Sequence, residues 1–184
     1  MADEGKAGSA EVEAYRFEDG GRIPNNPALP LLLYRAAIRP GEDAAARFEA
    51  LFAANGWGGG WRDGIYAYHH FHSNAHEVLG IARGEARVRL GGEGGATVAV
   101  RAGDVIVIPA GVGHKNEGAS DDLLVVGAYP GGRQPDLRTG EPGERSEVLE
   151  NIRKVPLPDA DPIHGADGPL LQHWRKAPAG MRQA

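Results

Sequence analysis

Glycine and proline interrupt this sequence so often that the intervals between them suit short strands better than long helices. The 184 residues include 28 Gly and 13 Pro. Glycine reaches backbone conformations that other residues avoid, and proline cannot donate a backbone hydrogen bond, so both concentrate in turns. The pattern predicts an all-β fold of many short strands with a few short peripheral helices.

Several of these intervals have the residue pattern of strands. Apolar and polar residues alternate in EARVRL (residues 85–90), and ATVAV (96–100) repeats the pattern, so that one face of each strand is buried. The intervening GGEGG predicts a hairpin. Residues 103–111 (GDVIVIPAG) and 122–129 (DLLVVGAY) are denser in apolar residues, which predicts strands buried on both faces near the middle of the sheets.

Helices are expected in two places. Asp43 can cap a helix over AAARFEALFAANG, with Gly56 past its end, and a short helix is expected near residues 146–154. Residues 155–174 contain too many prolines for a helix. We expect that segment to wrap on the β-structure or on a second subunit through its apolar side chains, which are Leu170, Leu171 and Trp174. The glycine-rich NGWGGGW (55–61) is expected to be a connection.

Composition limits the partners and the metal chemistry. The formal net charge is -5 and Lys and Arg are scattered, so no nucleic-acid partner is expected. The chain has no cysteine, so any metal must be bound by imidazole and carboxylate groups. The run LPLLLYRAAI is too short to cross a membrane, and the acidic N-terminus lacks the apolar core of a signal peptide. We therefore expect a cytoplasmic protein with no membrane partner and, at this length, a single domain over residues 1–184.

The segment HHFHSNAHEVLG (residues 69–80) contains four of the seven histidines of the chain and a glutamate directly after the last of them. A polar surface strand with chance histidines is one interpretation, and a metal site is the other. If residues 64–72 form a strand, alternate side chains share one face. The side chains on that shared face are Tyr66, Tyr68, His70 and His72.

A returning strand after residues 73–75 would place Glu77 on the same face as these histidines and His76 on the opposite face. His114 follows a Pro-Gly turn at the start of a later strand. Three imidazoles and one carboxylate are then able to meet, and such a set binds a divalent ion such as Fe, Mn, Ni, Zn or Co with coordination positions left open. A helical HxxxH pair of His72 and His76 is an alternative, which the strand alternation and the neighbouring glycines disfavour.

Two motifs of this sequence resemble those of the cupin superfamily. The first joins a Gly, a His-x-His pair, a Glu and a second Gly, and the later one joins a Gly, a Pro-x-Gly and a His. The matching residues are Gly64, His70, His72, Glu77 and Gly84, then Gly103, Pro109, Gly111 and His114. One position departs from the pattern, because Gly118 stands where the second motif often has an Asn and Asn116 lies nearby.

The longer segments HHFHSNAHEVLGI, GDVIVIPAGVGHKN and VVGAYP resemble the YjlB-like group of cupins. The resemblance implies a double-stranded β-helix, or jelly-roll barrel, in which one divalent metal is bound by His70, His72, Glu77 and His114. The alternative is a hydrogen-bonded polar core in a cupin that has lost its metal. We expect the barrel core at about residues 30–130, an N-terminal arm at 1–29 and a C-terminal helix and tail at 131–184.

By analogy with this family, we expect a metal-dependent enzyme that acts on a small oxygenated metabolite, with dioxygenase-type oxidation ahead of isomerisation. The metal would be Fe, Mn, Ni or Zn, Glu77 would double as a base, and Tyr66 and Tyr68 would orient the substrate. Amphipathic packing is the simpler role for the tyrosines. A non-catalytic binding or sensory module, with a structural metal or none, is the alternative function. A homodimer is expected because such barrels expose sheet edges and this one has terminal arms.

Overall fold

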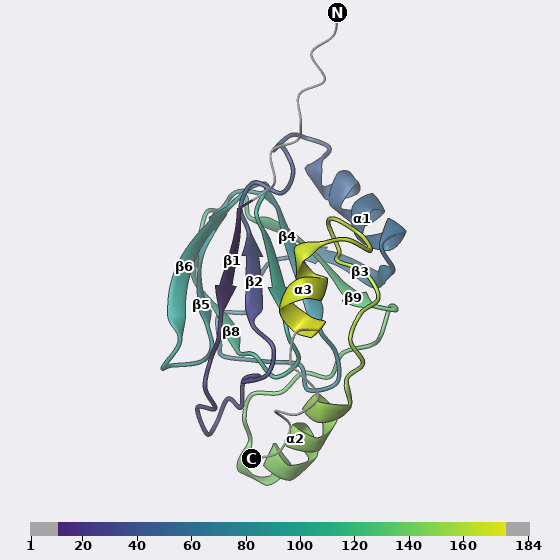
Figure 1. Cartoon of the computed structure of the whole chain (residues 1–184). Coiled ribbons are helices and arrows are strands. Elements are labelled where there is room, and N and C mark those ends of the chain that lie inside the picture. The colour runs from purple at the N-terminus through teal and green to yellow at the C-terminus, as the bar shows by residue number, and fades with distance from the viewer. Residues whose placement is uncertain (1–10, 176–184) are drawn as a thin grey trace, which may run out of the picture.

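A computed structural model describes residues 11–175, so the first ten residues of the expected arm and the last nine of the expected tail lie outside the described residues. The described chain forms two antiparallel sheets with short helices outside them (Figure 1). In chain order the strands are β1 (Val12–Tyr15), β2 (Leu31–Tyr34), β3 (Trp57–Asp63), β4 (Glu77–Arg83), β5 (Glu85–Leu90), β6 (Ala96–Arg101), β7 (Val105–Ile108), β8 (His114–Ala119) and β9 (Leu124–Pro130). The helices are α1 (Ala44–Ala54), the 3-10 turn η1 (Pro142–Glu144), α2 (Arg145–Lys154) and α3 (Pro169–Arg175).

The larger sheet has the strand order β1-β2-β7-β4-β9-β3, and the smaller has the order β6-β5-β8. Strands β7 and β9 therefore lie inside the larger sheet, as their dense apolar sequences predict. The predicted hairpin is also confirmed, because β5 pairs with β6 from Glu85 opposite Arg101 to Leu90 opposite Ala96. Gly91 and Gly92 turn the chain between them with positive φ angles of 84° and 78°, which glycine adopts without strain.

The space between the two sheets is filled by the inward side chains of strands from both. One buried cluster takes alternate residues from these strands: Leu79 and Ile81 from β4, Ala86, Val88 and Leu90 from β5, and Ile106 and Ile108 from β7. Burying a Leu, Ile or Val side chain fully contributes about 1.5–3 kcal/mol, so this interior dominates the stability of the barrel. Two sheets that share one such interior form the expected jelly-roll barrel.

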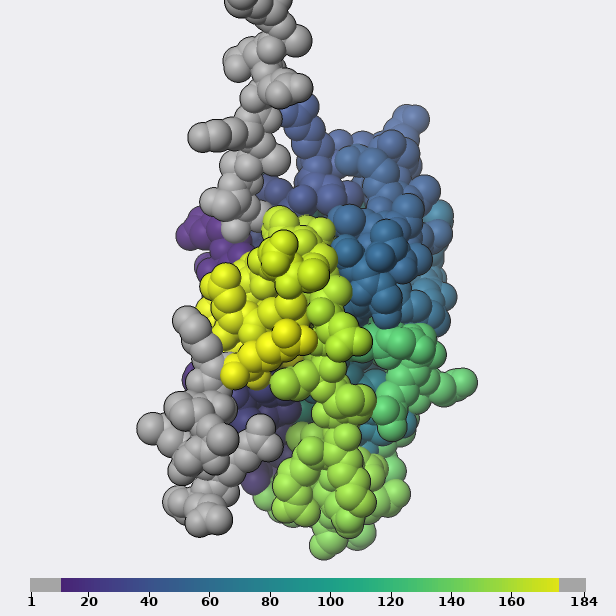
Figure 2. Space-filling model, turned by 45° about the vertical axis from the view of Figure 1, so that its right-hand side comes forward, coloured from purple at the N-terminus to yellow at the C-terminus, as the bar shows by residue number. Residues whose placement is uncertain are grey.

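A second apolar cluster lies on the outer face of the larger sheet, where α1 and α3 cover it (Figure 1). Val78 and Val107 point outward from the sheet into this cluster, which also contains Phe48, Phe52 and Trp174. Figure 2 shows the α3 segment (yellow) side by side with α1 (blue) on this face. The outer face of the larger sheet is therefore closed by helices of the same chain.

Close packing of α1 depends on Gly80 of β4. A Cβ atom at this position would lie 2.8 Å from the ring of Phe48, which is too close for any side chain. Helix α1 itself occupies the predicted residues, and Gly56 follows it with a φ of 80°. The predicted cap is wrong in one respect: Asp43 stands at the N-cap, but its Oδ1 accepts a hydrogen bond from Arg47 Nε at 2.9 Å instead of from a backbone N–H.

Helix α2 confirms the prediction near residues 146–154, whereas α3 corrects the prediction that no helix follows. The prolines of residues 155–162 precede α3, and Pro169 occupies its first position, where proline costs no hydrogen bond. Residues 170–174 contain no proline, so the helix continues. Its buried side chains contact the outer cluster of the protein's own larger sheet, and they are Leu170, Leu171 and Trp174.

Two segments differ from the expected secondary structure. Residues 57–63, expected to be a connection, form the edge strand β3 with an irregularity between Gly58 and Trp61, which the position at the sheet edge tolerates. Within the described chain, residues 64–76 form no continuous strand, and only isolated bridges join His70 to His114 and Phe71 to Arg138. The histidine-rich segment is therefore an ordered loop that crosses from β3 to β4.

Candidate metal centre

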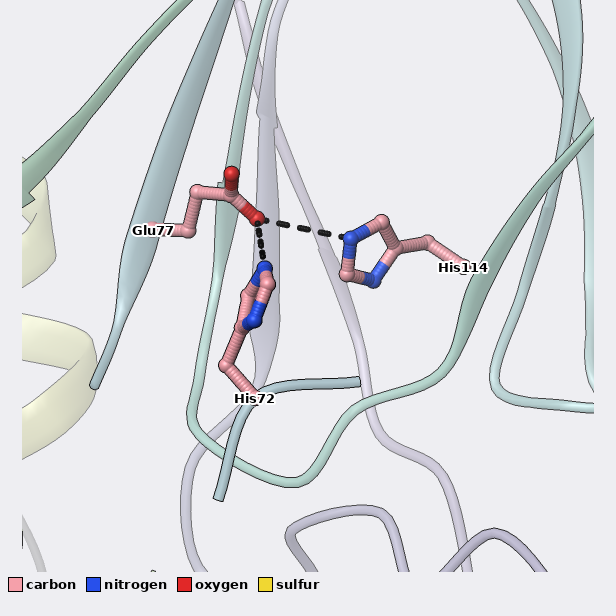
Figure 3. A group of neighbouring side chains, drawn as sticks. All are labelled: His72, Glu77 and His114. Carbon is pink, nitrogen blue, oxygen red and sulfur yellow. Dashed lines mark ion pairs between the residues drawn. The ribbon is translucent and has the colours of Figure 1, made fainter. Parts of the chain in front are cut away.

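Two neighbouring segments of the chain and one distant segment bring three side chains together inside the barrel: His72, Glu77 and His114 (Figure 3). Glu77 Oε2 lies 3.0 Å from His72 Nε2 and 3.4 Å from His114 Nε2. One nitrogen or oxygen atom from each residue lies within 4.8 Å of the others. Two imidazole nitrogens and a carboxylate oxygen at this spacing are donors that a divalent transition metal accepts.

The strands explain how two of these side chains reach the interior. Glu77 is the first residue of β4 and shares its inward face with Leu79 and Ile81. His114 is the first residue of β8 and pairs with Leu90 of β5. His72 instead comes from the loop that crosses between β3 and β4.

The histidines at this site have their Nδ1 atoms fixed by backbone carbonyls. His70 Nδ1 contacts Tyr68 O at 2.9 Å, and His114 Nδ1 contacts Val112 O at 3.2 Å. His72 Nδ1 contacts the carbonyl oxygen of Asp136 at 2.5 Å. Because a carbonyl only accepts hydrogen bonds, each Nδ1 must carry the proton, which leaves Nε2 with a free lone pair in the neutral ring. Histidines that bind metals are usually oriented in this way.

Glu77 is the acidic member of the group, and its two oxygens have different surroundings. Oε1 accepts a hydrogen bond from the Tyr129 hydroxyl at 3.3 Å, and that hydroxyl accepts one from Trp61 Nε1 at 2.8 Å. Oε2 is buried and has no hydrogen-bond partner among the described residues, although two imidazole nitrogens are close to it. A buried carboxylate oxygen without a donor is costly, and a cation bound between the three side chains would satisfy it.

Charge coupling shifts the pKa values of the group in opposite directions. Burial raises the pKa of Glu77, but the neighbouring His72 and His114 outweigh it and hold that pKa well below its usual range. Burial lowers the pKa of His72, and the charge of Glu77 more than offsets this, so the pKa of His72 is raised. The carboxylate that favours a charged His72 ring would equally favour a metal cation bound between the three side chains.

His70, the fourth expected ligand, lies beside the group but outside its 4.8 Å limit. Its ring centroid is 4.0 Å from that of His114 and 6.1 Å from that of His72. Burial and the charge of His114 lower the pKa of His70 to about 3, so its ring is neutral at ordinary pH. The structure thus brings three of the four expected ligands together and places the fourth next to them.

Tyr66 and Tyr68 were expected to face the barrel interior, but they are exposed, with exposed fractions of 54% and 43%. Their rings stack on each other with centroids 5.0 Å apart, and both meet the ring of His70 edge-on. The expectation fails because residues 64–72 bend out as a loop instead of continuing as a strand. Tyr66 still lines the cavity that leads to the three converging side chains.

His76 lies on the opposite side of the larger sheet from Glu77, so the helical pairing of His72 with His76 is wrong. Its Nδ1 accepts a hydrogen bond from Ala110 N at 2.9 Å, and its ring packs on Trp174 at 4.7 Å. Burial lowers the pKa of His76 to about 4. His76 is thus a neutral, buried side chain that links the sheet to α3.

A cavity of about 400 Å³ opens onto the candidate ligands. Its apolar walls include side chains from β3, β4 and β9 and from the loops that follow β3 and β9, namely Trp61, Ile65, Tyr66, Leu79, Tyr129, Pro135 and Leu137. This volume is in the range of cavities that bind small molecules. The site therefore combines a buried donor set with room for a small organic ligand.

The sequence interpretation missed Tyr129 and Asp136. Tyr129 has a signal in the sequence, because alternation along β9 places it on the same face as the interior residue Val125. Asp136 has no such signal. Its carbonyl reaches His72 only because the loop after β9 folds back over the histidine-rich segment.

Comparison with known proteins supports the class that the fold and these residues define. The Cupin domain family matches residues 61–126. The Uncharacterized protein YjlB of Bacillus subtilis (strain 168) is 46% identical over 166 residues, which cover 90% of this chain and 98% of that protein. This chain belongs to the cupin superfamily and, within it, to the YjlB-like group.

Solved structures match at lower similarity. An 11S allergen from Cocos nucifera is 22% identical, with 53% of this chain and 29% of that chain covered and a TM-score of 0.36. Procruciferin, an 11S globulin from Brassica napus, is 16% identical, with 82% and 34% covered and a TM-score of 0.37. The match thus spans about a third of these longer chains, and similarity at this level is too weak to inform on activity. Among the described helices, none is both long and apolar enough to cross a membrane.

Proposed function

We propose that this protein is a metal-dependent cupin enzyme that acts on a small oxygenated metabolite. His72, Glu77 and His114 would hold the ion, and His70 would complete the set after a small movement of its ring. The observation that carries the proposal is the buried Oε2 of Glu77, which lies between two imidazole nitrogens and has no hydrogen-bond partner among the described residues. A cation at this position would satisfy all three groups at once.

The donor set fits Fe, Mn, Ni or Zn, since imidazole and carboxylate ligands suit all four. When bound, iron supplies dioxygen activation, whereas Zn, Ni or Mn supplies polarisation of a carbonyl or enediol oxygen. We favour oxidoreductase chemistry and place isomerase chemistry second, on family analogy. A non-catalytic binding or sensory module is the remaining alternative.

Within this proposal, the residues of the chain have distinct roles. The low pKa of Glu77 keeps its carboxylate ionised, which suits a metal ligand better than a proton acceptor. Tyr129 would fix the carboxylate through Oε1 and leave Oε2 directed at the ion. Tyr66 at the cavity mouth would contact and orient the substrate, and Tyr68 would support Tyr66 by stacking.

Elemental analysis of untagged protein from unsupplemented medium tests the proposal and identifies the metal. We expect close to one equivalent of a single transition metal in the parent, and loss of that metal in His72→Ala and His114→Ala. Oxygen uptake and product analysis across a panel of hydroxy- and oxo-acids would then test catalysis. Variants that retain metal as well as the parent would refute the ligand assignment, and full metal content without turnover would favour the binding module.

Two further expectations remain proposals. We propose a homodimer, because β3 and β6 are sheet edges with no second strand partner among the described residues. Light scattering at micromolar concentration checks this, and a monomer would contradict it. We also keep a cytoplasmic location as a prediction.

A further inference from the structure

The histidines of the site differ in what holds their rings. His70 and His114 each donate from Nδ1 to the carbonyl two residues earlier, so their anchors belong to the same local segment. His72 donates to the carbonyl of Asp136, which is 64 residues later in the chain. The orientation of His72 therefore depends on a tertiary contact, whereas that of the other two is built into their own loops.

Asp136 also holds the residue that follows His72. Its Oδ1 accepts a hydrogen bond from Ser73 N at 2.7 Å, and its Oδ2 accepts one from the Ser73 hydroxyl. Ser73 is fully buried, so this contact has little competition from water. One aspartate thus fixes the His72 ring through its carbonyl and the adjoining backbone through its carboxylate.

The neighbours of Asp136 extend this attachment into a short strap, defined as residues 134–138. Phe71 and Arg138 exchange two backbone hydrogen bonds, each of 2.9 Å. Asn74 accepts from Asp136 N at 2.9 Å and donates to Gln134 O at 3.1 Å. The strap therefore pairs with the chain on both sides of His72.

Arg138 ties the strap to the C-terminal helices. Its Nε donates to Asp136 Oδ2 at 2.8 Å, and its Nη1 lies 3.1 Å from Glu144 Oε1. From α2, Asn151 donates to the Ser73 hydroxyl at 3.1 Å. The contact with Glu144 attaches the strap to η1, and the contact from Asn151 attaches α2 to the segment that carries His72.

We propose that Asp136 is a positioning residue for the metal centre, because it sets the place and direction of His72 Nε2. The inference rests on the proposed metal function and extends it to residues beyond the matched cupin region of 61–126. The strap also contributes Pro135 and Leu137 to the cavity wall. The strap would thus set both the position of the ligand His72 and part of the shape of the cavity.

Partners that orient ligating histidines typically change metal affinity by about 10–100-fold when removed. Titration of the metal-free protein with Co(II) measures this effect and reports ligand geometry through the visible absorption of the bound ion. Asp136→Ala keeps the backbone carbonyl that contacts His72 Nδ1 but removes the carboxylate that fixes Ser73. We therefore expect it to weaken Co(II) binding by about tenfold, the lower end of that range, and to change the absorption spectrum. Asp136→Asn keeps one acceptor for Ser73 N and should recover part of the affinity and the parental spectrum.

Asp104, the residue directly before β7, provides a matched control. It is a buried aspartate that accepts from two backbone N–H groups, of Ala36 at 2.9 Å and Arg101 at 3.1 Å, and pairs with Arg35 at 3.2 Å. Asp104→Ala should lower thermal stability at least as much as Asp136→Ala while it leaves Co(II) affinity and spectrum unchanged. Equal loss of affinity in both variants would reduce Asp136 to a general structural role and overturn the inference.

Ser73→Ala covers the case in which Asp136→Ala does not fold, because it removes only the two contacts of the hydroxyl, with Asp136 and Asn151. We expect a few-fold loss of Co(II) affinity, and unchanged affinity in this variant and in Asp136→Asn would overturn the inference. If Asp136→Ala binds Co(II) with the affinity and spectrum of the parent, this inference is overturned but the proposed function is not. If the parent fails to bind Co(II), or binds it equally well without His72 and His114, the proposed function fails and this inference fails with it.

Discussion

Glu77 and Asp161 are both buried carboxylates, with exposed fractions of 2% and 0%, but their oxygens have opposite surroundings. Asp161 Oδ1 accepts from the backbone N–H groups of Ile163 and His164, at 2.8 and 3.0 Å. Its Oδ2 accepts from the Tyr34 hydroxyl at 2.5 Å and from Leu170 N at 3.1 Å. Glu77 has one weak donor on Oε1 and none on Oε2 among the described residues.

The difference separates a structural carboxylate from a candidate ligand. Asp161 uses its acceptor capacity to fix the turn before α3, and it has no lone pairs left for a further partner. Burial and the adjacent Asp161 also raise the pKa of Tyr34, which keeps the tyrosine a neutral donor. Glu77 Oε2 has no hydrogen-bond donor among the described residues, and the Nε2 atoms of His72 and His114 lie beside it. Burial alone therefore does not distinguish a candidate ligand from a structural carboxylate, whereas unused acceptor capacity does.

The largest expected effect comes from replacing Glu77 by Gln. The amide is nearly the same size but supplies no charge, so metal affinity should fall at least 1,000-fold, or roughly 4 kcal/mol. The metal-free variant should unfold at the same temperature as the metal-free parent or higher, because a buried, unsatisfied carboxylate has been removed. Competition with a chromophoric chelator measures the affinity, and an affinity within tenfold of the parent would remove Glu77 from the ligand set.

Asp161→Asn should show the opposite behaviour. The amide nitrogen cannot accept, so two of the four donors around this residue lose their partner, and we expect a loss of roughly 3 kcal/mol in the free energy of unfolding. Metal affinity should be unchanged, because α3 lies on the outer face of the larger sheet. Urea denaturation of the metal-free protein checks the first result, and a loss of metal in this variant would end the distinction between the two carboxylates.

His76→Ala tests the neighbour of Glu77 in the sequence. It leaves Ala110 N without its acceptor and removes the contact with Trp174, so stability should fall by about 2 kcal/mol. Metal content should stay at the parental level. If this variant loses its metal, His76 belongs to the ligand set after all.

The pH dependence of stability provides a second test at His76. Its pKa falls from an ordinary 6.5 to about 4 in the folded protein. The neutral ring is thus favoured on folding, and this contribution is complete above pH 6.5 and is lost as the pH falls toward 4. Between these limits the metal-free parent should lose stability by up to about 1.4 kcal/mol per pH unit more than His76→Ala. Equal slopes for parent and variant would contradict the lowered pKa.

Among the substitutions that compare the two carboxylates and their neighbours, Tyr129→Phe should have the smallest effect. This change removes the donor to Glu77 Oε1 but no candidate ligand, so metal affinity should fall by about tenfold, at the lower end of the range for such partners. The cavity keeps its aromatic wall. An effect as large as that of Glu77→Gln would assign the tyrosine a direct role at the metal.

Local patterns in the sequence predicted most of the barrel. The alternation in 85–90 and 96–100 gave the β5–β6 hairpin, and the dense apolar runs of β7 and β9 gave the inner strands of the larger sheet. These elements are predictable because one buried face imposes a period of two on a strand. By contrast, α3 lies in a proline-rich stretch, and its helix depends on burial of Leu170 and Trp174 against the barrel.

The candidate site likewise has parts that local patterns predicted and parts that depend on tertiary packing. Strand alternation and the two motifs predicted that Glu77 and His114 would face the interior, and these two side chains do converge there with His72. The positions of the tyrosines were wrong, because no strand continues through residues 64–72 in the described chain. An interval of nine residues with mixed polarity does not determine whether it pairs with a neighbour or bends into a loop.

The sequence by itself determined the residue types at the site, which strands are buried on both faces, and the absence of thiolate ligands. Only the tertiary structure decided which donors meet and that the Asp136 carbonyl contacts His72. It also decided that Glu77 Oε2 has no hydrogen-bond partner among the described residues, whereas both oxygens of Asp161 have partners. The physical reason is the separation in sequence between the residues that interact. Periodicity records which face of a segment is buried, whereas a contact between residues 72 and 136 depends on how the intervening strands fold, which no local pattern encodes.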